Sequence, residues 1–89
     1  MLKPVTTKQF KRDFKKALRQ GKDVKKLEAI MAKLAGQEEL DLKHRDHKLT
    51  GNFKDRRECH IEPDWLLIYK IDIAKIIFER TGSHSDLFK

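Results

Sequence analysis

The sequence predicts an α+β fold in which an N-terminal αα-hairpin packs on one face of a small antiparallel β-sheet. Apolar residues recur at helical spacing through the first 36 residues. After Gly51 they give way to short runs rich in β-branched and aromatic residues. The chain has 89 residues and no repeat or Pro/Gly-rich linker, so residues 1–89 are expected to form a single domain.

The N-terminal region contains the signals of a short strand and two helices. Residues 1–5 are compatible with a strand, and Thr6 with Gln9 fits a capping box at the start of the first helix. Gly21 suits the end of that helix, and Asp23 is placed to cap the second. The apolar stripes of the two helices comprise Phe10, Phe14, Ala17 and Leu18, then Val24, Leu27, Ile30, Met31 and Leu34. The lysines of both helices then point outward.

The second half of the chain contains three runs that predict strands. They are "FKDRRECHI" (53–61), "WLLIYKI" (65–71) and "KIIFER" (75–80), with turns at 62–64 and 72–74. The last two runs are apolar on both faces, as expected of central strands that are covered on one side and partly covered on the other. The polar segment 37–51 between the helices and the strands is expected to be a loop.

The charge of the chain is concentrated at its N-terminal end. The first 26 residues hold ten Lys/Arg and two Asp, or +8, and the net charge of +7 therefore leaves −1 for the remainder. Such asymmetry favours a polyanionic partner, nucleic acid before membrane. Lys11, Lys15 and Lys16 are the expected RNA contacts, and a solvated helix face is the alternative interpretation.

The composition also favours a cytoplasmic protein. Cys59 is the single cysteine and forms no internal disulfide, so it is expected to be a small core residue. No stretch approaches the roughly 20 apolar residues of a membrane span, and no apolar N-terminal segment suggests export.

Residues suited to catalysis or to stacking on a base gather at the ends of the predicted strands: His47, His60, Asp64, Trp65, Arg80, His84 and Phe88. In an antiparallel meander His60 and Asp64 are neighbours across a turn, and the last hairpin brings Arg80 and His84 toward Asp64. RNA cleavage by its own 2′-hydroxyl needs a base, a cation beside the phosphate and an acid for the leaving oxygen. Histidines and an arginine supply these groups without metal, and an aromatic ring can stack on a base.

A zinc site is the competing interpretation of the same region, with ligands drawn from His44, His47, Cys59, His60 and His84. Cys59 and His60 are adjacent in a predicted strand, so their side chains point to opposite faces. A Cys/His nucleophile pair is disfavoured by the same geometry. No metal and no cofactor are therefore expected.

Three blocks in the second half identify a family. "DHKLTG" (46–51), "CHIEPDWLLIYK" (59–70) and "FERTGSHSDLF" (78–88) follow a basic helical hairpin in this order, and together they closely resemble the YafQ branch of the RelE/ParE toxin superfamily. The resemblance spans nearly the whole chain and implies a RelE-like microbial RNase fold. It also implies a bacterial type II toxin that enters the ribosomal A site and cuts translated mRNA, and that a cognate antitoxin holds inactive.

The resemblance implies active-site roles for His47, His60, Asp64, Trp65, Arg80, His84 and Phe88. Our hypothesis makes His84 the general acid and either His60 or His47 the base. Asp64 orients an imidazole or takes the proton, Arg80 stabilises the phosphorane, and Trp65 and Phe88 position bases or the C-terminal tail. His44 matches no functional position. Two alternatives stay open, a non-nuclease ParE-like toxin that acts on gyrase and a module that binds RNA without cutting it.

Overall fold

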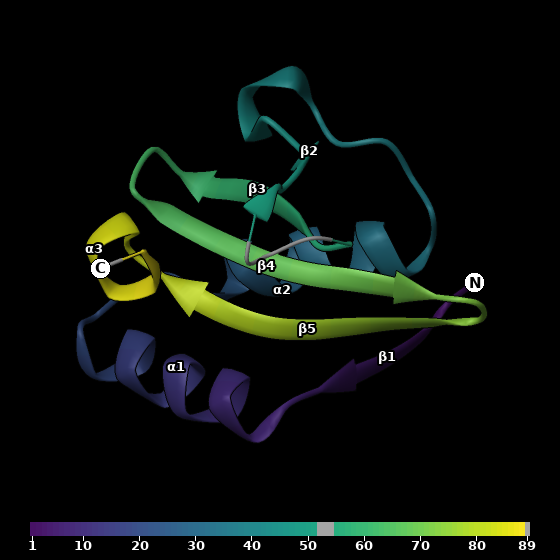
Figure 1. Ribbon diagram of the computed structural model, residues 1–89. Helices are drawn as coiled ribbons and strands as arrows, with labels where there is room; N and C mark the ends of the chain where they lie inside the picture. Colours follow the sequence, from purple (N-terminus) through teal and green to yellow (C-terminus); the bar gives the residue numbers. More distant parts are fainter. Residues whose placement is uncertain (52–54, 89) are drawn as a thin grey trace.

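A five-stranded sheet with the order β1-β5-β4-β3-β2 forms the centre of the computed structural model (Figure 1). The structure describes residues 1–51 and 55–88. The strands are β1 (Lys3–Thr6), β2 (His47–Lys48), β3 (Arg57–Glu62), β4 (Trp65–Asp72) and β5 (Lys75–Gly82). The α+β class is thus confirmed, and the two long strands of the β4–β5 hairpin match the predicted runs closely.

The sheet is mixed, whereas the sequence predicted an antiparallel one. Strands β2 to β5 pair antiparallel with their neighbours, but β1 pairs parallel with β5. Pairing starts beside the β4–β5 turn, where the backbone N–H of Lys3 donates to the carbonyl of Ala74. A four-residue strand far in sequence from its partner carries no hairpin signal, so its direction was not predictable.

Two helices follow β1, namely α1 (Lys8–Arg19) and α2 (Val24–Ala35). The N-cap of α1 is Thr7, not the predicted Thr6, because Thr6 is the last residue of β1. The Thr7 hydroxyl accepts from the Phe10 N–H at 3.0 Å and donates to the Glu79 carbonyl at 2.9 Å, which fastens the start of α1 to β5. Asp23 caps α2 as predicted, with Oδ1 3.2 Å from the Lys25 nitrogen.

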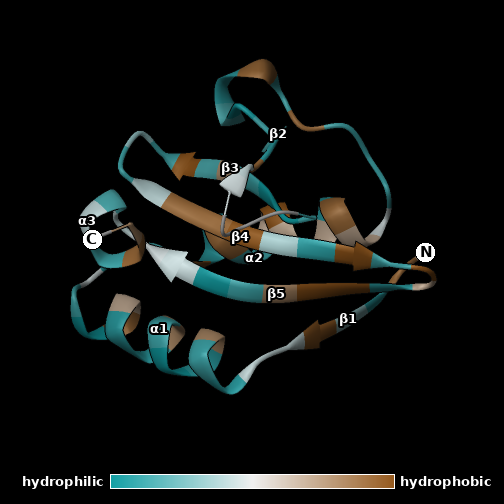
Figure 2. Cartoon of the chain, viewed as in Figure 1, coloured by the Kyte–Doolittle hydropathy of each residue, from teal (hydrophilic) through white to brown (hydrophobic). Residues whose placement is uncertain are grey.

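The main core lies between the two helices and one face of the sheet. In Figure 1, α2 crosses behind the sheet and α1 runs beside β5. The fully buried side chains of this core include Leu27, Cys59, Trp65, Leu67, Tyr69, Ile76 and Phe78. Figure 2 shows the apolar colour along β4 and β5 and the hydrophilic colour on the outer side of α1. Within the described part of the chain, no helix is both long and apolar enough to cross a membrane.

A second, smaller apolar cluster covers part of the other sheet face. It contains Leu66, Ile68 and Leu87, with Leu49 and Phe88 packed against them. Leu87 belongs to α3 (His84–Leu87), which follows β5 directly, and Leu49 follows β2. The expectation that the central strands are covered on one face and partly covered on the other is therefore confirmed.

The predicted loop 37–51 contains two short elements, the 3-10 helix η1 (Leu42–His44) and β2. The first predicted run, 53–61, corresponds to β3, which starts at Arg57. Its predicted first residues, 53 and 54, lie outside the described residues. These differences matter for function because the β3–β4 turn and α3 meet at one end of the sheet (Figure 1), while β2 pairs with the start of β3.

Candidate active site

Two histidines converge on one buried carboxylate at the edge of the sheet. His47 of β2 pairs with Glu58 of β3, and alternation along β3 places Glu58 and His60 on the same face. The Nε2 atoms of His47 and His60 lie 3.7 and 3.4 Å from Glu58 Oε1. Glu58 is only 4% exposed, and both imidazoles lie within 4 Å of its carboxylate.

Backbone carbonyls fix the orientation of both rings. His60 Nδ1 lies 3.2 Å from the Pro63 carbonyl oxygen, and His47 Nδ1 lies 2.6 Å from that of Arg45. A carbonyl oxygen only accepts, so each Nδ1 carries the hydrogen and donates it. Nε2 is therefore the atom of either ring that faces the Glu58 carboxylate.

His84 comes to the same place from α3. Its ring centroid lies 6.2 Å from that of His60 and 5.6 Å from that of Phe88. The backbone N–H of His84 donates to Asp64 Oδ1 at 3.0 Å, and Nδ1 lies 3.7 Å from the same oxygen. The structure thus confirms that His84 and Asp64 meet, and it leaves Nε2 of His84 directed away from Asp64.

A capping box holds α3 in position. The Ser83 hydroxyl accepts from the Asp86 N–H at 3.1 Å, and Asp86 Oδ2 accepts from the Ser83 N–H at 3.2 Å. The Ser83 N–H and the Lys16 ammonium lower the pKa of Asp86. Lys16 bonds Asp86 Oδ1 at 3.1 Å, so α1 and α3 are tied together at the surface.

Arg80 lies in a network with α1, a contact that the sequence interpretation did not foresee. Its Nε and Nη2 donate to Asp13 at 2.9 and 3.3 Å, and the Thr81 N–H donates to the same carboxylate at 3.1 Å. Asp13 is 8% exposed and is the one acidic residue of α1. The guanidinium has five N–H donors; two serve Asp13, which leaves three for a phosphate.

Trp65 is not placed to stack on a base. The ring is 1% exposed and lies in the main core. Its Nε1 donates to the Thr81 hydroxyl at 3.0 Å, and that hydroxyl donates to the Leu66 carbonyl at 2.7 Å. Trp65 therefore supports the strand that carries Arg80. A tryptophan at a strand end serves the core as readily as a ligand, and the burial of this ring disfavours the predicted contact with a base.

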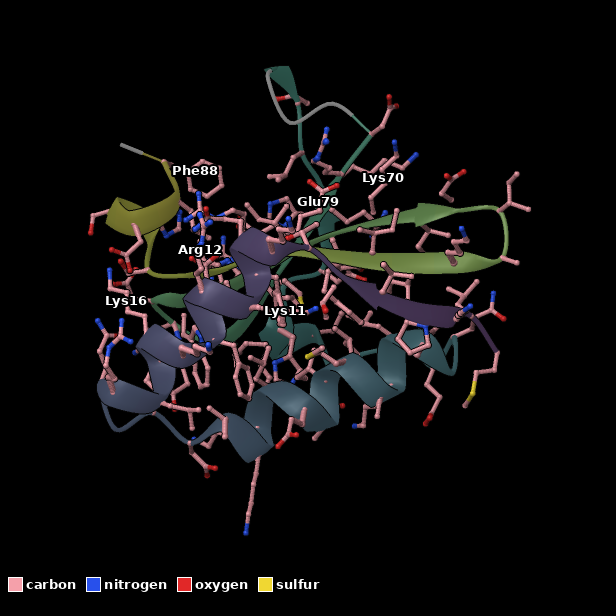
Figure 3. The ribbon with its side chains drawn as sticks, turned by 90° about the horizontal axis from the view of Figure 1, so that it is seen from below. Lys11, Arg12, Lys16, Lys70, Glu79 and Phe88 are labelled. Atoms are coloured by element: carbon pink, nitrogen blue, oxygen red, sulfur yellow. The ribbon has the colours of Figure 1, made fainter. Side chains whose placement is uncertain are left out.

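The remaining predicted residues occupy the surface of this end or of α1. Phe88 packs on Leu66 and Ile68 and on the His84 ring, which suits a positioning role. Lys11 and Lys15 are exposed on α1, and Figure 3 shows Arg12 and Lys16 on the side of α1 that faces α3.

Three contributors were missed by the sequence interpretation, namely Asp13, His44 and Glu58. Glu58 was detectable, because the two-residue period of a strand places it beside His60. Asp13 was also detectable as an acid on the apolar stripe of a basic helix. His44 matched no functional position in the sequence, but its Nδ1 bonds the His60 carbonyl at 2.7 Å and so supports β3.

Among residues 1–51 and 55–88, no group of three or more His, Cys, Asp or Glu side chains is arranged to hold a metal ion. Cys59 is fully buried on the opposite face from His60, and burial raises the pKa of its thiol to about 12. A thiol in this setting neither ligates a metal nor acts as a nucleophile.

The fold and the histidine-rich end define a toxin of the RelE/ParE superfamily. Within it, the chain belongs to the family described as bacterial toxin of type II toxin-antitoxin system, YafQ, whose profile matches residues 2–89. It is 42% identical over 81 residues to the mRNA interferase toxin YafQ of Escherichia coli strain K12, covering 90% of this chain and 88% of the relative.

Two solved structures share the fold along their full length. YafQ in the Escherichia coli DinJ–YafQ complex superposes with a TM-score of 0.92 at 38% identity, covering 100% of both chains. The crystal structure of a metal-bound toxin from Helicobacter pylori gives a TM-score of 0.93 at 42% identity, covering 99% of this chain and 100% of the other.

Proposed function

We propose that this toxin cuts translated mRNA on the ribosome by acid–base catalysis, with the RNA's own 2′-oxygen as nucleophile. The chain is an mRNA interferase by its family and by its 42% identity to the Escherichia coli enzyme. The observation that carries the mechanism is the meeting of a histidine–carboxylate cluster with an exposed imidazole whose ring centroid lies 6.2 Å from that of His60.

His47 is the base that best fits the geometry. Both nitrogens of His60 face protein oxygens, and its side chain is only 9% exposed. The Nε2 atom of His47 also faces Glu58. The His47 side chain is 49% exposed, however, so a 2′-hydroxyl can reach it. The 2′-hydroxyl proton passes to His47 Nε2, and Glu58 with His60 stabilises the charge that results.

His84 is the acid on the other side of the phosphate. Its Nδ1 faces Asp64, so Nε2 is the atom that protonates the departing 5′-oxygen. The 2′-oxygen bonds to phosphorus as the bond from phosphorus to the 5′-oxygen breaks, and the charge on the phosphorane is met by the free N–H groups of Arg80. The products are a 2′,3′-cyclic phosphate and a 5′-hydroxyl.

The proposed partners are the ribosome with its mRNA, which the basic face of α1 contacts through Lys11, Lys15 and Lys16, and a cognate antitoxin. The Escherichia coli relative is solved in complex with DinJ. A net charge of +7 favours an acidic partner for this chain as well.

Primer extension on a translated mRNA, with and without purified toxin, tests the function. We expect cuts that require translation and leave 2′,3′-cyclic phosphate ends. Toeprint blocks without cuts would support an RNA-binding module, and inhibition of gyrase without cuts a ParE-like toxin. A zinc-specific chelator tests independence from metal without stripping the magnesium that ribosomes need. Activity lost on chelation and restored by zinc would contradict the metal-independent step.

A further inference from the structure

A groove of about 320 Å³ lies between α1, the end of β5 and α3. We call it the α1–α3 groove. Its cationic side chains are Arg12, Lys16, Arg19, Lys22 and Arg80. Arg12, Lys16 and Arg19 follow the i, i+4, i+7 spacing that places them along one side of α1, in a row about 10 Å long.

The acids in this groove are already engaged. Asp13 accepts from Arg80 and from the Thr81 N–H, and Asp86 accepts from Lys16 and caps α3. Five cations against these two carboxylates leave a charge of +3. Within the described part of the chain, neither Arg12 nor Arg19 has a hydrogen-bond or ion-pair partner. Two free guanidinium groups are suited to bind a phosphate with paired N–H donors.

The walls of the groove are fixed by packing. Gly82 forms part of one wall, and a Cβ there would lie 3.2 Å from the Asp86 Cβ, so the absent side chain lets α3 pack close to β5. Trp65 lies at the floor, with the Lys22 ammonium 5.3 Å from its ring centroid. The groove is therefore a shaped site that continues from Arg80, not a loose row of surface charges.

We propose that the α1–α3 groove binds a backbone phosphate of the mRNA, adjacent to the phosphate that is cut. The inference rests on the proposed function, in which Arg80 meets the reacting phosphate. Arg80 lines the groove, and in the proposed function it also meets the reacting phosphate; a strand whose scissile phosphate lies at His84 then continues along Arg12 and Arg19. The contact is to phosphate alone, and it fixes the register of the strand without reading its bases.

Trp65 is the only tryptophan in the chain, and its fluorescence reports on the groove. The probe is a single-stranded DNA oligonucleotide, which lacks the 2′-hydroxyl and cannot be cut by the proposed route. A phosphate that draws the Lys22 ammonium from the ring changes the emission. We expect a saturable change whose log affinity falls linearly with log salt concentration. If DNA binding does not change the emission, or if binding does not depend on salt, the groove does not bind phosphate as proposed.

The discriminating variant is Arg12→Gln with Arg19→Gln. Both side chains are exposed, so the fold is retained, and the salt slope should fall by about 0.7 for each phosphate that the variant no longer neutralises. Lys3→Gln with Lys75→Gln is the matched control, because it removes the same charge at the opposite end of β5. An unchanged slope in the first variant would show that these arginines neutralise no phosphate, and an equal decrease in the control would show that only overall charge matters.

Ribosomal RNA offers the same phosphate chemistry, and a second arm separates the two sources. The double arginine variant should cut ribosome-bound mRNA more slowly but bind mRNA-free ribosomes like the wild type. Weaker binding to mRNA-free ribosomes would overturn the assignment to mRNA. The fluorescence assay requires no cleavage, so a toxin that binds DNA in the groove but cuts no mRNA would overturn the proposed function and leave the groove established.

Discussion

The two imidazoles that meet at this site are held in opposite ways. His60 projects from a central strand, with 9% of its side chain exposed and with both ring nitrogens facing protein oxygens. His84 projects from a one-turn helix, with 59% of its side chain exposed and with one carboxylate beside it. The difference indicates a division of labour, in which the sheet supplies a fixed cluster that is part of the fold and α3 supplies a group that the fold does not need.

The largest expected effect is on cleavage, and it comes from removing the exposed imidazole of α3. His84→Ala should lower cleavage by roughly 10²–10⁴-fold, or about 3–5 kcal/mol of barrier, because the leaving oxygen loses its acid. Since the side chain is exposed, the melting temperature should stay that of the wild type. Single-turnover cleavage and calorimetry measure the two quantities. A wild-type rate from folded protein would remove His84 from the chemistry.

Asp13→Ala should come next, because it removes a buried carboxylate that holds Arg80. We expect the free energy of unfolding to fall by about 2–3 kcal/mol, since the Thr81 N–H and the guanidinium lose their acceptor. Cleavage should fall as well, through misplacement of Arg80. A double-mutant cycle with Arg80→Ala checks this, because Asp13→Ala should slow cleavage little once Arg80 is gone. Additive losses would mean that Asp13 acts independently of Arg80.

His60→Ala tests whether the histidine on the sheet contributes to the fold as well as to cleavage. It should lower both cleavage and stability, the latter by about 1–3 kcal/mol, because Glu58 stays buried beside a vacated space. Chemical denaturation gives the stability and primer extension the activity. If His60→Ala is as stable as His84→Ala, the two histidines do not differ in the way we describe.

The smallest expected effect concerns Cys59, the neighbour of His60 on the other face of β3. Burial raises the pKa of its thiol to about 12, so at pH 8 the reactive thiolate is scarce and enclosed. Iodoacetamide should not label the folded toxin, while labelling in denaturant should be complete. Mass spectrometry reads both, and rapid labelling of the native protein would show that the sheet opens readily.

Local patterns predicted the elements of this fold well and the long-range contacts poorly. Periodicity identified both helices and the β4–β5 hairpin, because each is decided by neighbouring residues. The parallel pairing of β1 and the bond from Asp13 to Arg80 join residues about 70 positions apart, and no local signal carries them. The same limit explains Trp65, whose burial depends on where α1 comes to lie.

The sequence predicted which residues lie at the site but not the carboxylates that hold them in place. His47, His60, Asp64, His84 and Phe88 do gather at one end of the sheet, as the strand ends implied. The supporting carboxylates Glu58 and Asp13 were absent from the prediction, although the periods of a strand and a helix pointed to both. Glu58 lies two residues before His60 in β3, so strand alternation alone places both side chains on the same face.

The parallel edge strand also bears on the order in which the chain folds. β1 is the first strand to be synthesised, yet its one neighbour in the sheet is β5, the last. Closing so long a loop is slow compared with local pairing. Until β5 has been made, β1 has no strand to pair with, Thr7 has no Glu79 carbonyl and Asp13 has no Arg80. A nascent chain therefore completes the histidine-rich end of its sheet only after β5 and α3 have been synthesised.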